Sequence, residues 1–264
     1  MKRLQLFEFE DLPWFPGALR ECMTNYLAGV HRFVGTSELL RPLLARALAE
    51  SDSHAIVDLC SGGGGPLPTI AGELLGPGGG VMSVTLTDRY PNLTAARAIN
   101  AGYTAIRYLE ASVDATAVPG DLVGLRMMIG SFHHMAPVVA HAILADALKS
   151  RRPIVVYELS DNAAPIALWW LAVPFNAVVA LLATPFVRPF SLVGLVFTYV
   201  IPILPFTIAW DGAVSNARTY TPDDLRELTT DLQSPDYTWE IGLTTKKGYP
   251  GNACYLIGLP TKPV

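Results

Sequence analysis

The chain of 264 residues is poor in charge, because Asp, Glu, Lys and Arg together make up only 16% of it. Soluble domains usually carry about 25%, and the mean hydropathy here is +0.34. The formal net charge of −4 argues against the basic face that nucleic-acid binding needs, so we expect no nucleic-acid partner. The shortage of charge is concentrated in one region, since Arg188 is the only charged residue between Ala163 and Ala209.

Cysteine is also scarce, and Cys22, Cys60 and Cys254 are far apart in the sequence. Their spacing fits neither a CxxC motif nor a zinc site, so we expect three reduced thiols in a cytosolic compartment. The N-terminus has Lys2 and Arg3 but no apolar stretch behind them, which does not resemble a cleaved signal peptide. We therefore expect the part that carries the chemistry to stay in the cytoplasm.

Short apolar runs alternate with amphipathic stretches, a pattern typical of an α/β fold with a doubly wound, mostly parallel sheet. Seven strands are expected around residues 54–60, 81–88, 104–111, 124–132, 152–160, 237–245 and 252–260. Helices are expected over 67–75, 92–100, 137–150 and 221–232. We expect a single domain, 1–264, with an N-terminal helical cap over 1–50 and a hydrophobic insertion over 163–210, after the fifth strand.

The stretch IVDLCSGGGGP, residues 56–66, runs from the first strand through an aspartate into four glycines. Glycines at such a turn let the backbone approach a ligand closely. A phosphate-binding P-loop would need Lys followed by Ser or Thr after the glycines, whereas the sequence has Pro66 and Leu67 there. A dinucleotide-binding GxGxxG motif fits the spacing poorly, and Pro66 removes a donor amide from the start of the next helix.

The stretch resembles the first motif of the class I S-adenosylmethionine-dependent methyltransferases, an acidic residue followed by spaced glycines. In this resemblance Asp58 is the motif acid and Cys60 stands where the first glycine normally is. Gly62 and Gly64 are the second and third motif glycines, with Gly63 between them. The resemblance implies that this turn holds the methionine end of S-adenosylmethionine.

Two further aspartates match positions that the family uses. Asp88 ends the second strand, where the family binds both ribose hydroxyls, and a carboxylate suits that task because it accepts two hydrogen bonds. Asp114, followed by Ala115, comes after the third strand, where the family contacts the adenine. The ends of successive parallel strands share one edge of the sheet, and an acidic edge suits a cationic sulfonium better than a pyrophosphate.

His133 and His134 follow the fourth strand, at the edge where the family places the transferred methyl group. A neutral histidine accepts a proton near pH 7, so both are candidate catalytic residues; the alternative is that one caps the next helix and the other packs. Glu158 ends the fifth strand on the same edge and is expected to contact the substrate or to cap the next segment. No metal site is expected, because the sequence offers no third ligand near the histidines.

Aromatic residues near the N-terminus are a further candidate for acceptor contact. Trp14 and Phe15 lie between Pro13 and Pro16, and segments before the first motif often close over the site in this family. The alternative is that they pack against the outer helices as a hydrophobic staple. The remaining histidines are expected to have no catalytic part: His31, His54 and His141.

The uncharged region divides into Ala163–Val187 and Pro189–Trp210, each long enough to cross a bilayer core, which takes about 20 helical residues. Prolines in both segments argue against two straight spans, so a kinked hairpin dipping into one leaflet fits better, with Arg188 at its turn. Such a hairpin returns to the cytoplasmic face. The alternatives are a lid over an apolar pocket and a buried homodimer interface.

Together these features predict an S-adenosylmethionine-dependent methyltransferase that acts at oxygen or nitrogen of a hydrophobic small-molecule or lipid-like acceptor. We expect it at the cytoplasmic face of the membrane or, alternatively, soluble in the cytoplasm. A nicotinamide-dependent oxidoreductase would need GxGxxG and a catalytic Tyr/Lys pair, and neither can be placed in the sequence. A membrane-anchored protein that binds the cofactor without turnover stays compatible with Cys60 in the place of a glycine.

Overall fold

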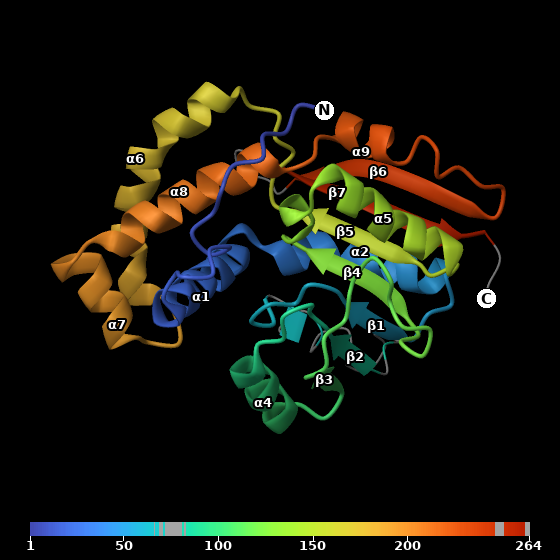
Figure 1. The fold of residues 1–264 in the computed structure, drawn as a ribbon, viewed down its shortest axis with the longest axis horizontal. Helices are drawn as coiled ribbons and strands as arrows, with labels where there is room; N and C mark the ends of the chain where they lie inside the picture. The colour runs from blue at the N-terminus through green and yellow to red at the C-terminus, as the bar shows by residue number, and fades with distance from the viewer. Residues whose placement is uncertain (66, 69–70, 72–80, 82, 246–250, 262–264) are drawn as a thin grey trace.

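The computed structural model describes residues 1–65, 67–68, 71, 81, 83–245 and 251–261, so the predicted helix over 67–75 falls largely outside the described residues. Seven strands form one sheet in the order β3-β2-β1-β4-β5-β7-β6 (Figure 1). The strands are β1 (Ala55–Asp58), β2 (Ser83–Leu86), β3 (Ile106–Tyr108), β4 (Leu125–Ile129), β5 (Ile154–Glu158), β6 (Tyr237–Thr245) and β7 (Asn252–Pro260). β7 runs antiparallel to β5 and β6, and the other neighbouring pairs are parallel. The prediction of a mostly parallel seven-stranded sheet is confirmed.

Helices cover both faces of the sheet (Figure 1). The helices α2 (Thr36–Glu50) and α4 (Leu93–Gly102) pack on one face, and α5 (Pro137–Lys149) and α9 (Pro222–Leu228) on the other. Successive side chains of β5 alternate between the two core clusters: Val155 and Tyr157 join the first, and Ile154 and Val156 join the second. Because both faces are buried, the central strands read in the sequence as continuous apolar runs.

Residues 163–218 form a helical extension beside the sheet (Figure 1). Helices α6 (Ile166–Ala183) and α8 (Ile203–Arg218) pack along each other. They are joined by η2 (Thr184–Phe186), α7 (Leu192–Leu195) and the π-helical turn η3 (Val196–Val200). Pro165 and Pro202 directly precede the two long helices, where a missing N–H group costs little, and α8 continues past Trp210, the predicted end of the insertion.

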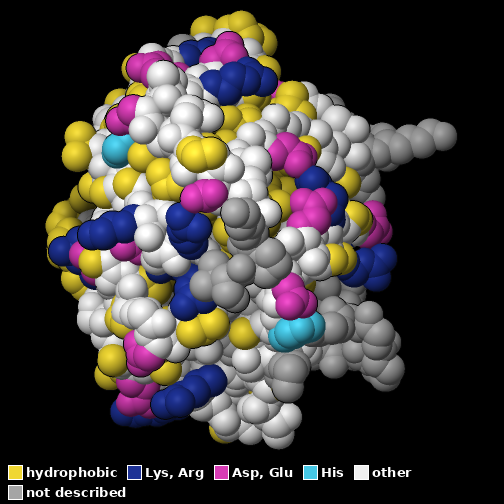
Figure 2. Space-filling view, turned by 90° about the vertical axis from the view of Figure 1, so that its right-hand side faces the viewer, with side chains coloured by type: hydrophobic (Ala, Val, Ile, Leu, Met, Phe, Trp, Pro, Cys, Tyr) yellow, Lys and Arg dark blue, Asp and Glu magenta, His cyan; other side chains and the backbone are white. Residues whose placement is uncertain are grey.

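The surface of the helical extension is strongly apolar. Within the described residues, Ala167–Phe186 is the one helical segment that is long and apolar enough to cross a bilayer, with a mean hydropathy of 1.8 and only 11% of its window buried. Leu192–Val200 and Ile203–Arg218 meet the same criterion only together, across a bend of 91°. The opposite end of the molecule differs, because acidic and basic side chains are scattered between hydrophobic ones there (Figure 2).

The residues before α1 (Gly17–Val34) cross the second half of α8 without forming helix or strand (Figure 1). We call residues 3–12 the N-terminal strap. The backbone N–H of Leu4 donates to the carbonyl oxygen of Ala217 at 2.8 Å. The carboxylate of Asp211 accepts the N–H groups of Phe9 and Glu10, at 2.8 and 3.1 Å. The strap is therefore fastened to the helical extension along its length.

Candidate active site

The turn after β1 has the backbone conformation that glycine allows. The φ angles are +53° at Gly62, +97° at Gly64 and +51° at Gly65, and Cys60 also has a positive φ of +60°. A Cβ at Gly64 would lie 2.8 Å from Cδ1 of Ile99, so α4 packs directly against this glycine. A Cβ at Gly62 or Gly65 would meet no atom of the described residues within 4 Å. The turn is thus tight against α4 on one side, and the described part of the chain leaves its other side open.

The three predicted acids lie around this turn. Asp58 is buried at the end of β1 and accepts a hydrogen bond from Oγ of Ser61 at 2.5 Å. Asp88, which follows β2, accepts the backbone N–H of Gly62 at 2.8 Å. Asp114 accepts two hydrogen bonds from Thr116, at 2.9 and 2.7 Å, and its carboxylate stays partly exposed. Asp88 therefore connects the second strand directly to the glycine turn.

Burial shifts the pKa values of two side chains at this corner. Burial raises the pKa of the Asp58 carboxyl to about 7, with a hydrogen bond from Ser61 opposing the rise and the charge of Asp88 adding to it. Burial, with the charges of Asp88, Asp58 and Asp114, also raises the pKa of the Cys60 thiol to about 12. The backbone N–H of Val113 also donates to the carbonyl oxygen of Asp88 at 2.9 Å, and Asp88 binds Gly62. The segments that follow β1, β2 and β3 therefore lie side by side, as expected for the ends of neighbouring parallel strands.

Other residues complete the walls of this corner. The hydroxyl of Tyr108, the last residue of β3, donates to the carbonyl oxygen of Gly62 at 2.8 Å. A Cβ at Gly63 would lie 3.0 Å from Cγ2 of Thr24, which brings α1 against the glycines. Ala115 is buried in the core cluster that α5 and α9 cover. The predicted cofactor contacts of these glycines, of Cys60 and of the three acids stay predictions.

His133 and Glu158 form a buried pair where β4 and β5 end. His133 lies in the short helix η1 (Phe132–His134), and its Nδ1 is 2.8 Å from Oε2 of Glu158. The other oxygen of Glu158 accepts the backbone N–H of His133 at 3.0 Å. Burial alone would raise the pKa of Glu158, but the charge and hydrogen bonds of His133 outweigh burial and hold it below its usual value. The ionised carboxylate therefore orients the imidazole through Nδ1.

The other nitrogen of His133 faces the N-terminal strap. Its Nε2 is buried, has no hydrogen-bond partner among the described residues, and lies 4.0 Å from Oε1 of Glu8. The ring of His134 lies against the ring of His133, with centroids 4.3 Å apart. Nδ1 of His134 is 3.2 Å from a carboxylate oxygen of Asp11 and 3.3 Å from Nη1 of Arg218. Both predicted histidines thus share one buried cluster.

Sequence reasoning missed the charged partners of this cluster. Glu8 is 2% exposed, and burial, against the charges of His134 and Arg218, raises its pKa to about 7. The guanidinium of Arg3 donates to the carbonyl oxygens of His133 and Arg218, at 2.8 and 2.7 Å. No spacing rule connects these residues to the strand ends. The acidic and aromatic run FEFED, residues 7–11, is the one local signal that marks the strap.

Trp14 and Phe15 have apolar neighbours, unlike the residues of the charged cluster. Phe15 is buried in a third core cluster with Leu19, Met23 and Leu204, between α1 and α8. Trp14 is 69% exposed and touches the edge of Phe15. The structure gives Phe15 the packing position that the staple alternative describes, and acceptor contact by either residue stays a prediction.

His31, which is expected from the sequence to have no catalytic part, lies beside the site. His31 of α1 is buried, and its Nδ1 is 3.0 Å from Oγ1 of Thr36. A Cβ at Gly130, just after β4, would be 3.7 Å from its Nε2. Burial lowers the pKa of His31 to about 4, so it stands as a neutral wall of the site near pH 7. His141 instead pairs with Asp231 on the surface, at 3.0 Å.

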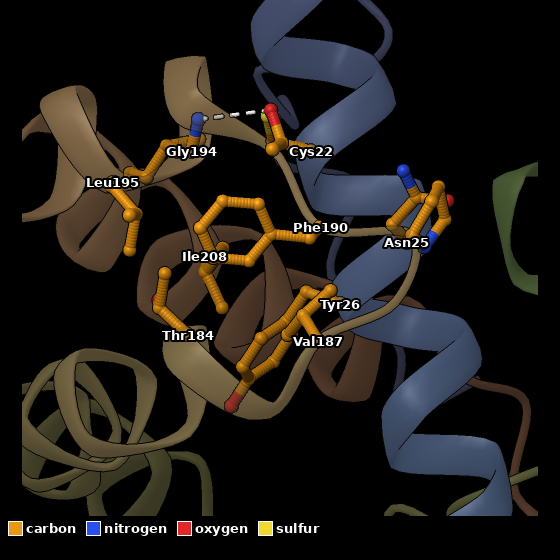
Figure 3. A pocket seen from close by; sticks show the side chains of 12 residues that line it. Cys22, Asn25, Tyr26, Thr184, Val187, Phe190, Gly194, Leu195 and Ile208 are labelled. Carbon is orange, nitrogen blue, oxygen red and sulfur yellow. Dashed lines mark hydrogen bonds between the residues drawn. The ribbon is translucent and has the colours of Figure 1, made fainter.

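An apolar pocket lies between α1 and the far end of the helical extension (Figure 3). Tyr26 lines it from α1, and Phe190, Leu195 and Ile208 line it from the extension. The rings of Tyr26 and Phe190 face the space between the two elements (Figure 3). Ile208 precedes Arg218 by ten residues on α8, about 15 Å along the helix. The pocket therefore suits an apolar group rather than a reacting atom at His133.

No protein-family profile matches the sequence, and no curated protein matches it. The plantazolicin methyltransferase BpumL, in complex with SAH, superposes with a TM-score of 0.61 at 9% identity, over 96% of this chain and 94% of that one. The plantazolicin methyltransferase BamL gives 0.54 at 8% identity, over 93% and 98%. The mitomycin 7-O-methyltransferase MmcR gives 0.56 at 13% identity, over 96% of this chain and 61% of that one.

At such low identity these likenesses bear on the fold, and they extend over nearly the whole chain. The strand order with its antiparallel β7 is the arrangement that the sequence resemblance implied. The glycine turn at the end of β1 also lies where the resemblance places it. This chain therefore has the fold of the class I S-adenosylmethionine-dependent methyltransferases.

Proposed function

We propose that the protein transfers the methyl group of S-adenosylmethionine to an oxygen or nitrogen atom of a hydrophobic small molecule. The observation that carries this proposal is the glycine turn with Asp58 at its start, Asp88 bonded to it and Asp114 on the adjoining segment, within a fold shared with methyltransferases. An acidic corner attracts a sulfonium cation and repels a pyrophosphate. The BpumL structure contains SAH, which supports the choice of cofactor.

Each part of the corner suits one part of the cofactor. Asp58, Cys60 and the glycines from Gly62 to Gly64 are assigned to the methionine end, where an open backbone allows close approach. Asp88 is assigned to the ribose hydroxyls, because its carboxylate has acceptor sites beyond the N–H groups of Gly62 and Tyr90 that it already binds. Asp114 and the adjacent Ala115 are assigned to the adenine.

His133 is assigned to the acceptor. Glu158 holds its Nδ1, which leaves the lone pair of the neutral ring on Nε2. As the acceptor atom attacks the methyl carbon, the carbon–sulfur bond breaks, its electron pair stays on the sulfur of the product SAH, and the acceptor proton passes to Nε2. The carboxylate of Glu158 then stabilises the imidazolium. Because Glu8 lies 4.0 Å from Nε2, the strap moves aside to admit the acceptor.

We infer further that the helical extension contacts the membrane and that the acceptor is correspondingly apolar. The exposed and apolar surface of α6 supports membrane contact, because a helix that is apolar all round is normally surrounded by lipid or protein. The free cysteines Cys22, Cys60 and Cys254 support a catalytic part on the cytoplasmic face.

Calorimetry with SAH and with NADH separates the cofactor classes. We expect SAH to bind and NADH not to bind. An Asp88→Ala variant should bind SAH about 10- to 100-fold more weakly, because it loses charge-assisted hydrogen bonds to the ribose. Asp121→Ala, which removes an exposed carboxylate from the loop before β4, at the edge of the sheet where β1 begins, is the control and should bind normally. Binding of NADH instead of SAH would favour an oxidoreductase.

Turnover is tested with labelled S-adenosylmethionine and a panel of quinone-like, polyketide-like and lipid acceptors. We expect label on an apolar acceptor, and His133→Ala should lower kcat about 100-fold or more while the affinity for SAH stays unchanged. Tight binding of SAH without transfer to any acceptor would instead support a binding protein without turnover.

A further inference from the structure

Three side chains that commonly bind metals meet where β4 and β5 end. Glu8 comes from the N-terminal strap, and His133 and His134 come from η1. One ligand atom of each residue lies within 4.8 Å of those of the other two. The sequence predicted no metal site because no third ligand stands near the histidines along the chain. The fold supplies that third ligand from the strap.

Both ring nitrogens of His133 are placed as a metal-binding imidazole requires. Its Nδ1 is 2.8 Å from the carboxylate of Glu158, the pairing that orients imidazole ligands in metal sites. Its Nε2 is buried, without a hydrogen-bond partner among the described residues, and lies 4.0 Å from Oε1 of Glu8. A metal ion bonded to nitrogen and oxygen at about 2.0–2.2 Å from each fits between two such atoms.

The surrounding charges leave room for a cation. Three carboxyl groups, those of Glu8, Asp11 and Glu158, lie at the cluster beside two guanidinium groups, those of Arg3 and Arg218. Arg218 approaches Oε2 of Glu8, at 3.3 Å, while Oε1 faces His133. Arg218 and a metal ion would therefore use different oxygens of the same carboxylate. A metal bound to Nδ1 of His134 would replace the contact of Arg218 with that nitrogen, at 3.3 Å.

We propose that Glu8, His133 and His134 bind a zinc ion, and that bound zinc fixes the strap over His133. Two imidazole nitrogens and one carboxylate oxygen are a ligand set of zinc sites that keep an open position, whereas Mg²⁺ prefers oxygen ligands and water. The consequence for turnover rests on the proposed function. Zinc occupies the Nε2 lone pair that takes the acceptor proton, so it stops methyl transfer.

Zinc binding is measured by calorimetry on the full chain, without cofactor or acceptor. We expect one zinc per chain and no measurable binding of Mg²⁺. Glu8→Gln should weaken zinc binding by at least about 100-fold, because a lost ligand costs at least as much as a lost second-shell partner, about 10- to 100-fold. Asp11→Asn is the matched control, since its carboxylate also contacts His134 from the strap, at 3.2 Å, without belonging to the three ligands.

Asp11→Asn should keep an affinity close to that of the natural chain. His134→Gln removes a second ligand and leaves the sequence of the strap unchanged, so it replaces Glu8→Gln if that variant does not fold. Equal zinc affinity in the natural chain and in either ligand variant would overturn the site. Failure of methyl transfer would leave this result standing, because calorimetry detects the ion whether or not the protein turns over.

Fixing of the strap is measured by hydrogen exchange. Zinc should slow exchange of the backbone amides over residues 4–12 in the natural chain, because local opening of the strap would require breaking the bond to Glu8. The same amides in Glu8→Gln should exchange alike with and without zinc. Zinc should also inhibit transfer in competition with the acceptor rather than with S-adenosylmethionine. Unchanged exchange of the natural strap at saturating zinc would overturn the fixing of the strap.

Discussion

Cys60 is the residue at which this chain departs from the methyltransferase motif, and its backbone explains why glycine is usual there. Its φ of +60° lies in the left-handed region, which costs a residue with a Cβ about 1–2 kcal/mol. The side chain packs at the edge of the core cluster that contains Leu59 and Met128. Because burial and the three nearby aspartates raise the pKa of the thiol to about 12, Cys60 is a packing residue and not a nucleophile.

Asp58 should make cofactor binding depend on pH. Burial raises the pKa of its carboxyl to about 7, so the unliganded side chain is neutral below that pH. The sulfonium and ammonium groups of the cofactor favour the carboxylate form. Affinity for S-adenosylmethionine should therefore rise as pH increases towards 7, by up to about tenfold per pH unit, and level off above it. Calorimetry on both sides of pH 7 measures this change.

Asp58→Asn is the test of that assignment, because an amide does not titrate. Its affinity should be lower and should not vary over the same range. Asp114→Asn is the control: two hydrogen bonds from Thr116 hold the pKa of Asp114 below its usual value, so the variant should keep the slope of the natural chain. A slope that survives in Asp58→Asn would contradict the prediction.

The elements differ in how far the sequence determines them. The bounds of β6 and β7 match the apolar runs at 237–245 and 252–260, because these strands pair along their whole length. The run at 54–60 is longer than β1, since Leu59 and Cys60 stay at least partly buried after the chain has turned. An apolar run in the sequence indicates buried residues, and residues stay buried here beyond the point where strand pairing ends.

The residues of the candidate site also differ in how far the sequence predicts their positions. Asp58, Asp88 and Asp114 could be predicted, because parallel strands end at one edge of the sheet and place their following residues together. Glu8 and Arg218 could not, because their meeting depends on how the strap and the end of α8 fold back over the sheet. The apolar pattern ends at Ala209, but α8 continues to Arg218 with polar residues buried against the strap.

The fastening of the strap to α8 should depend on Asp211. Its carboxylate accepts the N–H groups of Phe9 and Glu10. Asp211→Ala leaves both N–H groups without this acceptor and should lower the free energy of unfolding by about 2 kcal/mol. Asp211→Asn keeps one acceptor oxygen and should cost less. Chemical denaturation measures both, and equal stability of the alanine variant and the natural chain would show that the strap is held elsewhere.

The whole molecule has two unlike ends. One end carries acidic and basic side chains mixed over its surface (Figure 2). At the other end, large apolar side chains are exposed along α6 and the turns that follow it, among them Leu171, Phe175, Leu182, Phe186 and Val200. The same α8 that packs along α6 holds the strap over His133. The proposed lipid contact and the proposed acceptor site are thus both built against one helix, α8.

The membrane contact is tested by floating the protein with phosphatidylcholine vesicles. Leu171, Phe175 and Leu182 are 75%, 69% and 70% exposed, so changing all three to serine should leave the unfolding temperature nearly unchanged. Each large apolar side chain buried in lipid contributes about 1.5–3 kcal/mol. The triple variant should therefore partition into vesicles at least about 1,000-fold less, and Val123→Ser with Val138→Ser, on the sheet side, should float normally. If the natural chain does not float but forms a dimer that the triple variant loses, the helical extension is an interface between two copies and the membrane proposal is wrong.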